Sequence, residues 1–319
     1  MPGTADLNQA DPIVGIVNDS ITSVTASDLR QNRSPQFVDV VRTACRETGF
    51  FCIQPDPEQR TIIARTLHRM QQFFAIDDKD PRKQEVRQDD SRQGWQPRYS
   101  EPAYQPGTIS SLEAFDLGIG EINGNDRWPS ISGFREDVSA CWSEYLSLAD
   151  NALEVLALAA GIEQDFFITR CSSRKLNSMR LLHYTEDLQP HRDEGVGIAA
   201  HTDFECITLL YQSAPGLELR NVRGDWFDAP VGNDRIIVLL DDMLERWTNG
   251  FFKATGHRVR ETDEKRFSIV MFNAVNPEIT VEPLDQFIST SSPANYTPVT
   301  QAEHLDEEIR RAEKYAERK

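Results

Sequence analysis

Three features are scarce in this 319-residue sequence: long hydrophobic runs, paired cysteines and basic residues. Nowhere do about eighteen apolar residues follow one another, and the N-terminus lacks the basic start and apolar core of a secretory signal. The five cysteines are odd in number and scattered, without a Cys-x-x-Cys pair, so neither a disulfide framework nor a thiolate zinc site is indicated. We expect a cytoplasmic protein without a membrane partner.

Basic residues are outnumbered by acidic ones, with 34 Lys and Arg against 51 Asp and Glu, for a formal charge of −17. Such a surface repels a polyanion, so we expect no nucleic-acid partner. The hydrophobic share of 39% and charged share of 27% are ordinary for a globular protein with a conventional core. The sequence does not indicate an oligomeric state.

The first half of the chain has the periodicity of helices. Apolar residues recur at helical intervals in three segments, which predict helices over 27–48, 57–76 and 134–160. A short apolar strand is expected at 50–53. Residues 77–130 are rich in Asp, Gln, Arg, Gly and Pro, with isolated aromatics such as Tyr104, which favours a long ordered loop of the kind that often covers an active site.

After Lys175 the chain changes to short apolar segments separated by Gly, Pro, Asn and Asp, a pattern typical of an antiparallel sandwich or barrel. Strands are predicted at 176–184, 197–201, 205–212, 217–220, 226–229, 235–240, 255–260, 266–274 and 278–282. The charged segment 300–319 predicts an exposed C-terminal helix. We divide the chain into an N-terminal helical region with its covering loop, supporting helices, a β core and a C-terminal helix, at 1–130, 131–175, 176–299 and 300–319.

The stretch GIAAHTDFECITLLYQ carries the most informative pattern. His201 and Asp203 stand two residues apart at the end of a predicted strand, so their side chains point to the same face. One imidazole and one carboxylate supply two ligands for a divalent metal, and His257, on a later strand, is the candidate for the third. Three ligands on one face leave positions open for a chelating co-substrate and dioxygen, whereas a closed structural zinc site has none.

A His-x-Asp pair alone is weak, because a histidine near an apolar strand is more often hydrogen-bonded than metal-bound. Its context strengthens it. Arg266 and Ser268 follow His257 at the start of another predicted strand and share one face. The arginine fork matches a carboxylate, and the hydroxyl adds a further bond; a surface salt bridge is the alternative for Arg266.

These residues carry a family resemblance. The sequence resembles the isopenicillin N synthase-like 2-oxoglutarate- and iron(II)-dependent oxygenases over most of its length. The stretches that resemble the family's N-terminal region are ETGFF at 47–51, NGNDRWP at 123–129 and SGFRE at 132–136. Those that resemble its catalytic core are MRLLHY at 179–184, AHTDFECITLLYQ at 200–212, GLELR at 216–220, ERWTNGFFKATGHRV at 245–259 and RFSIVMFN at 266–273.

The resemblance implies a mainly β protein with flanking helices, in which an α-rich N-terminal region accompanies a double-stranded β-helix (jelly-roll) core. It implies that the cofactor Fe(II) is bound by the catalytic residues His201, Asp203 and His257. It also implies 2-oxoglutarate, held by Arg266, Ser268 and Tyr184, and dioxygen as co-substrates. The expected reaction is hydroxylation, desaturation or cyclisation of a small organic molecule, in secondary metabolism.

Other residues have two interpretations each. Tyr184 matches a co-substrate contact but is also an ordinary half-buried strand tyrosine. Phe272 and Arg180 match positions near the substrate, although a core aromatic and an internal ion pair are the alternatives. Three further histidines, His68, His191 and His304, are assigned to structure or solvent.

Two other functions stay open at this point. One is an oxidase of the same family that directs Arg-x-Ser at its substrate or at a small anion and uses no 2-oxoglutarate. The other is a non-catalytic jelly-roll binding protein, in which a triad and an anion clamp together would be unnecessary.

Overall fold

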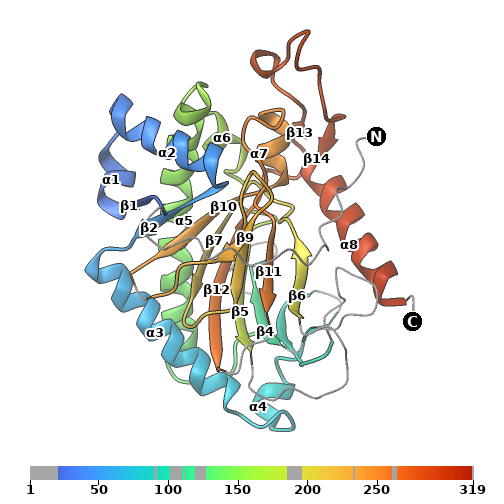
Figure 1. Cartoon of the computed structure of the whole chain (residues 1–319). Coiled ribbons are helices and arrows are strands. Elements are labelled where there is room, and N and C mark those ends of the chain that lie inside the picture. Colours follow the sequence, from blue (N-terminus) through green and yellow to red (C-terminus); the bar gives the residue numbers. More distant parts are fainter. Residues whose placement is uncertain are drawn as a thin grey trace.

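Two β-sheets packed face to face form the centre of the molecule, with helices on the outer face of the larger one (Figure 1). The computed structural model describes residues 21–89, 92–100, 110, 112–118, 127–184, 196–232, 234–260 and 264–317. The larger sheet has eight strands in the order β1-β2-β10-β7-β12-β5-β4-β3, and the smaller has four in the order β6-β11-β8-β9. The expected jelly-roll core with flanking helices is confirmed.

All nine strands predicted after Lys175 are present, with ends that differ by a few residues. They are β5 (Ser178–Tyr184), β6 (Val196–His201), β7 (Ile207–Gln212), β8 (Leu217–Arg220), β9 (Trp226–Asp228), β10 (Ile236–Leu240), β11 (His257–Arg260), β12 (Arg266–Asn273) and β13 (Thr280–Val281). The last pairs with β14 (Val299–Thr300) in a separate two-stranded sheet. Strand periodicity was therefore sufficient to locate the core.

The central strand β12 shows why the sequences of the core strands are almost continuously apolar. Ile269 and Met271 face the helices, whereas Val270 faces the smaller sheet, so both sides of the strand are buried. The helix layer on the outer face is dominated by α5 (Phe134–Ala160), which packs against α2, α3 and β12 (Figure 1). This helix has the predicted bounds and ends at Gly161, whose φ of 75° is the left-handed conformation that glycine adopts easily.

The predicted helix over 27–48 is wrong as a single element. The structure has α1 (Ala26–Gln31) and α2 (Pro35–Glu47), separated by three residues. Pro35 disfavours helical geometry at the preceding residue, and the Ser34 side chain caps the new helix by accepting from the N–H of Phe37. A proline that begins a helix has divided one apolar stripe into two elements.

The remaining N-terminal elements add two strands to the larger sheet and one helix to the layer outside it. They are β1 (Ser23–Thr25), β2 (Phe50–Gln54) and α3 (Pro57–Phe74). Asp56 forms a capping box with Gln59, which explains why α3 begins where Pro57 predicts. Two further helices, α6 (Phe166–Arg170) and α7 (Asp242–Trp247), follow α5 and β10. No helix in the described ranges has the length and apolar character needed to cross a membrane.

The prediction of a long loop over 77–130 missed its regular structure. Within it lie α4 (Pro81–Gln84), β3 (Gly94–Gln96) and β4 (Glu113–Leu117), and the two strands extend the larger sheet beyond β5. Tyr104 lies outside the described residues. Such short strands carry little periodic signal, and β4, which joins β3 to the sheet, pairs with β5, about 65 residues further along the chain.

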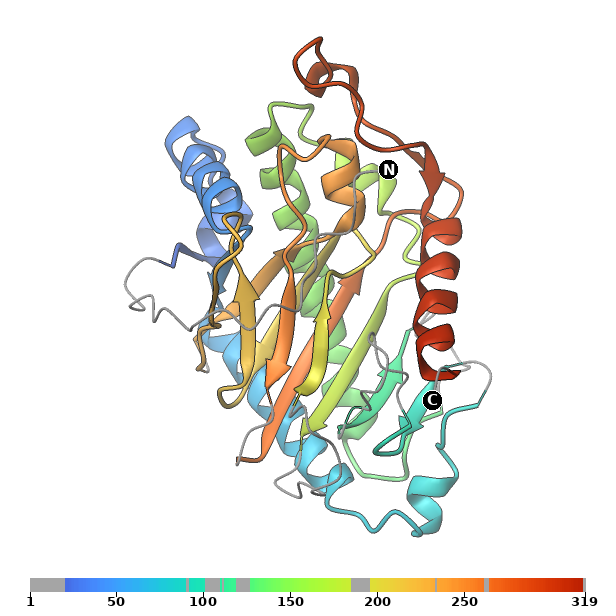
Figure 2. The ribbon, with the colours of Figure 1, turned by 45° about the vertical axis from the view of Figure 1, so that its right-hand side comes forward.

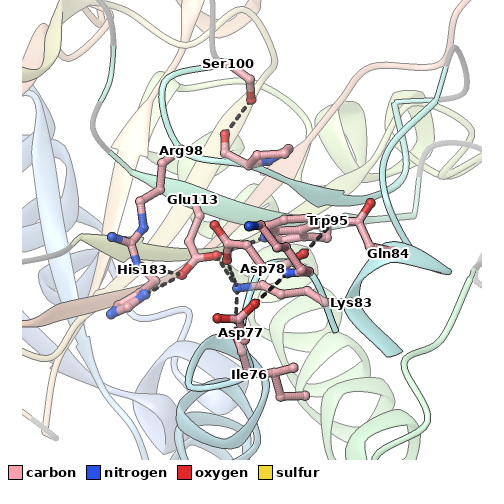
Figure 3. Close-up of polar contacts among 12 residues, drawn as sticks. Ile76, Asp77, Asp78, Lys83, Gln84, Trp95, Arg98, Ser100, Glu113 and His183 are labelled. Atoms are coloured by element: carbon pink, nitrogen blue, oxygen red, sulfur yellow. Dashed lines mark hydrogen bonds and ion pairs between the residues drawn. The ribbon is translucent and has the colours of Figure 1, made fainter. Parts of the chain in front are cut away.

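A closed ionic network fastens this segment to the sheet (Figure 3). The Lys83 ammonium group is fully buried and lies 2.8 Å from both Glu113 and Asp78, and it donates to the carbonyl of Ile76 at 3.2 Å. Glu113 also accepts from the Trp95 indole at 2.9 Å and contacts His183 Nδ1 at 2.8 Å.

Each polar group of this largely buried network has a partner, so the network holds α4, β3, β4 and β5 together. Burial alone would raise the Glu113 pKa, but the contacts with His183 and Lys83 hold that pKa below its usual value.

The C-terminal helix α8 (Gln301–Glu317) runs along one side of the two sheets (Figure 2). It was predicted to be exposed, but one side of its first turn is buried. The Gln301 amide is buried, donates to the carbonyl of Phe204 at 2.9 Å and accepts from the N–H of Val275 at 3.1 Å. His304 is buried against Asp242 at 2.8 Å. The helix is thereby joined to the turn that follows β6.

Candidate metal centre and adjoining pocket

His201, Asp203 and His257 meet between two neighbouring strands of the smaller sheet. His201 ends β6 and His257 begins β11, and the two residues are direct partners in the antiparallel register. Their ring centroids are 4.2 Å apart. Asp203 follows β6, and its Oδ1 atom lies 3.5 Å from Nε2 of each histidine. The structure therefore brings together the three residues that spacing selected.

The backbone fixes the orientation of both imidazoles. His201 Nδ1 lies 2.8 Å from the carbonyl of Ala199, and His257 Nδ1 lies 3.1 Å from that of Thr255. A carbonyl can only accept, so each Nδ1 must carry the proton and each Nε2 presents its lone pair to the centre. This arrangement is the usual support for a metal-binding histidine.

The electrostatics favour the protonation states that a metal requires. Burial alone would raise the Asp203 pKa, but the adjacent His257 and His201 outweigh it and lower that pKa to about 2. Burial, helped by repulsion from His201, lowers the His257 pKa to about 4. The carboxylate is ionised and the imidazole neutral at neutral pH, so neither has to lose a proton to bind a cation.

The triad also passes a direct test of fit. Its ligand atoms lie within 4.8 Å of one another, and Asp203 Oδ2 is buried without a hydrogen-bond partner. A buried, unsatisfied carboxylate oxygen costs free energy unless a ligand completes it. Two histidines and one carboxylate on one face form the donor set of non-haem iron centres that bind further ligands.

A pocket of about 180 Å³ adjoins the triad, between the two sheets. It is lined by residues of several elements, namely Ser178, Arg180, Leu182, Tyr184, Ile198, His201, Asp203, Phe204, Glu205, Leu210, Leu217, His257, Val259, Arg266, Ser268, Val270, Phe272, Leu305 and Ile309. Every residue that the sequence proposed for metal, co-substrate or substrate is among them. Most of the other lining residues are apolar, as expected for a ligand site.

Arg266 provides a buried cation at this pocket. Its side chain is 1% exposed, its guanidinium carbon lies 4.3 Å from the centre of the Tyr184 ring, and its Nε donates to Gln212 Oε1 at 3.2 Å. Nevertheless, within the described residues, Arg266 Nη1 has no partner, and neither does the buried hydroxyl of Ser268, two residues along the same strand. Two adjacent donors without acceptors fit a carboxylate.

Arg180 on β5 and Phe272 on β12, two neighbouring strands of the larger sheet, also line the pocket. Arg180 Nε donates to Asp116 at 2.8 Å and its Nη2 donates to Gln96 at 2.9 Å. The internal ion pair that was the alternative for Arg180 is therefore present, on the pocket face. Phe272 is partly exposed on β12, directly opposite Ser178 of β5.

The fold and the triad together define a non-haem iron oxygenase, and comparisons with known proteins agree. Residues 176–274 match the 2OG-Fe(II) oxygenase superfamily, and residues 21–131 match the N-terminal region named for a non-haem dioxygenase in morphine synthesis. A 2-oxoglutarate-Fe(II) type oxidoreductase from Aspergillus fumigatus is 30% identical over 86% of this chain and 87% of its own. Homoarginine-6-hydroxylase 2-ODD-C23 from Glycine max is 27% identical over 85% and 88%.

Among solved structures, a full-length Neurospora crassa protein in complex with alpha-KG and thymine has the same fold, with a TM-score of 0.77. It is 21% identical, and the match covers 97% of this chain and 99% of that one. The chain belongs to the 2-oxoglutarate- and iron(II)-dependent oxygenase family. It is an oxidoreductase whose family uses Fe(II), 2-oxoglutarate and dioxygen.

Sequence reasoning missed several residues of the pocket. Gln212 orients Arg266 and is itself held by the carbonyls of Ala229 and Pro230 at 3.3 and 3.1 Å. It does not line the pocket itself but ends β7 opposite Ser268, a pairing that the sequence does not reveal. Leu305 and Ile309 were hidden in a charged helix. Of the four other histidines, His304 is buried against Asp242, His183 contacts Glu113, His68 lies on α3, and His191 is outside the described residues.

Proposed function

We propose that His201, Asp203 and His257 hold Fe(II) and that Arg266 and Ser268 hold the distal carboxylate of 2-oxoglutarate. One observation carries this proposal. A carboxylate oxygen, a guanidinium nitrogen and a hydroxyl, each buried without a partner, line the same pocket. Buried polar atoms are almost always satisfied, so three in one pocket indicate ligands.

Each residue then has a definite part. The two Nε2 atoms and the Asp203 carboxylate supply the metal ligands, and the metal with its co-substrate supplies the activation of dioxygen. Arg266 neutralises the co-substrate's far carboxylate, while the Tyr184 ring supports the guanidinium from one face. Leu210 and Val270 present apolar surface that keeps water from this charge pair.

The substrate is a small organic molecule, which is hydroxylated, desaturated or cyclised in secondary metabolism. The pocket dimensions and its apolar lining support this size, and so does a relative named as a homoarginine hydroxylase. Phe272 and Arg180 contact the substrate. We place the enzyme in the cytoplasm, a compartment that suits five buried free thiols, and without nucleic-acid partners because of the charge of −17.

Anaerobic titration with Fe(II) and then 2-oxoglutarate tests the cofactor assignment. We expect a visible charge-transfer band that requires both additions. A metabolite screen scored by succinate release then tests the reaction. Substrate loss without succinate would identify the oxidase alternative, and absence of both the band and any turnover would identify a binding protein.

A further inference from the structure

Glu205 is a second carboxyl group in the pocket that the metal centre does not use. It lies two residues after Asp203, lines the cavity and is 7% exposed. Within the described parts of the chain, the set of side chains close enough to share a metal ion comprises His201, Asp203 and His257, without Glu205. The carboxyl group therefore stands beside the centre and is not a fourth ligand.

The protein gives this group little compensation. The N–H of Phe204 donates to its Oε2 atom at 3.1 Å. No Lys, Arg or His nitrogen of the described residues forms an ion pair with it. A buried carboxyl group in such surroundings is stabilised by any donor that a ligand brings, and most by a cation.

The cationic side chains at the same pocket do not supply that compensation. Arg180 is already engaged by Asp116 and Gln96. Arg266 belongs to the co-substrate in the proposed function, where it faces a carboxylate. With those charges matched, Glu205 is the acidic residue among the lining residues, apart from the proposed metal ligand Asp203, that is left for recognition.

Apolar side chains complete the surroundings of Glu205. Phe204 precedes it in the chain, Phe272 lies on β12, and Leu305 and Ile309 project from α8, all lining the same cavity. Leu305 and Ile309 are four residues apart on one face of the helix. These apolar side chains line the same cavity as Glu205, and away from bulk water a hydrogen bond to a carboxylate is stronger than it is in water.

We propose that Glu205 determines substrate specificity by accepting a hydrogen bond from an ammonium, guanidinium or ring N–H group of a substrate whose remaining part is apolar. This inference rests on the proposed function, because it assigns the substrate of the same pocket. The substrate assigned here differs in charge from the substrates of oxygenases that select carboxylic acids.

Three probes with one apolar body distinguish the classes: 3-phenylpropylamine, 3-phenylpropanol and 3-phenylpropionic acid. Binding is measured by calorimetry on anaerobic protein loaded with Mn(II) and 2-oxoglutarate. We expect the amine to bind best, the alcohol less well and the acid least. In Glu205→Gln, the preference for amine over acid falls by about tenfold or more, as expected for loss of a charge-assisted bond.

Glu308→Gln is the matched control. Glu308 lies on α8 next to Ile309, is ion-paired with Arg311 at 2.7 Å and does not line the pocket. The same loss of charge at this position leaves the order of the three probes unchanged. If both variants change it equally, the preference reflects the general field of an acidic protein and the specificity role is wrong.

The loading step separates this inference from the proposed function. If the Fe(II) and 2-oxoglutarate band is absent in the wild type, the proposed function fails. If the band forms normally in wild type and Glu205→Gln, and the amine has no advantage or keeps it in the variant, the function stands and the role of Glu205 is overturned.

Discussion

The two faces of the β5–β12 ladder bury polar groups in opposite ways. On the helix face, Lys83, Glu113 and His183 satisfy one another in a closed network (Figure 3). On the pocket face, Arg266 Nη1 and Ser268 Oγ have no partner. Both clusters cost desolvation free energy, but one is completed by the chain and the other requires a ligand. Whether the buried polar groups have hydrogen-bond partners in the protein, and not burial alone, distinguishes a structural cluster from a binding site.

The largest effect should come from removing a metal ligand. His257→Ala leaves two protein ligands, and we expect Fe(II) affinity to fall by at least about 100-fold and turnover to vanish, because even supporting contacts contribute about 10–100-fold. Circular dichroism and metal titration measure folding and binding separately. Normal turnover of a folded variant would refute the metal centre.

Breaking the closed network should destabilise the fold. Lys83→Met leaves the buried Glu113 carboxylate without its ammonium partner, and we expect the free energy of unfolding to fall by about 3–5 kcal/mol. Urea denaturation measures it. Lys79→Met, at an exposed lysine of the same segment, should change it by less than about 0.5 kcal/mol.

A second variant sharpens this prediction. Removing both charges, with Lys83→Met and Glu113→Gln together, should cost less than the sum of the two single changes, because neither charge is then left unpaired. Additive losses would mean that the ion pair itself contributes little and that packing of the lysine stem explains its burial.

On the pocket face, the same kind of change should affect binding more than folding. Arg266→Ala removes the cation opposite the proposed co-substrate carboxylate, so we expect the concentration of 2-oxoglutarate for half-maximal turnover to rise about 10–100-fold, for a charged bond of about 1.5–3 kcal/mol.

Thermal unfolding gives an independent readout for this variant. In metal-loaded protein, 2-oxoglutarate should raise the melting temperature of the wild type and not of Arg266→Ala. An equal rise in both proteins would show that the anion binds elsewhere.

The smallest effect should come from Ser268→Ala. The hydroxyl is buried without a partner in the described part of the protein, so its removal should leave stability within about 0.5 kcal/mol and weaken 2-oxoglutarate binding about fivefold, for a neutral donor worth about 1 kcal/mol. Calorimetry under anaerobic conditions measures the binding. A larger loss of stability than of binding would identify Ser268 as a structural residue.

The comparison of faces also explains what the sequence could predict. The strands of the core follow from short apolar segments bounded by turn residues. The common face of His201 and Asp203 follows from the period-two geometry of a strand, and His257 was the candidate on a later strand. The division of the first helix was also visible at Pro35. By contrast, β4 owes its place to pairing with β5, β3 to pairing with β4, and both to the Lys83 network, which joins residues far apart in the chain.

Glu205, Gln212, Leu305 and Ile309 could not be recognised for a similar reason. A glutamate beside an apolar strand, a glutamine at a strand end and two aliphatic residues in a charged helix have no distinctive local pattern. Their importance depends on which atoms remain unpaired, or face the cavity, after folding.

The bridge from Gln301 has a practical consequence for anyone who edits the gene. The amide of one side chain is hydrogen-bonded both to the turn after the proposed metal ligand Asp203 and to the backbone at Val275, just after β12 ends. Truncating the chain before residue 301 would leave the Phe204 carbonyl and the Val275 N–H without these hydrogen bonds. It would also remove the part of the cavity wall that Leu305 and Ile309 form. Purification handles are therefore best attached at the opposite terminus, and domain-trimming campaigns should retain this last helix.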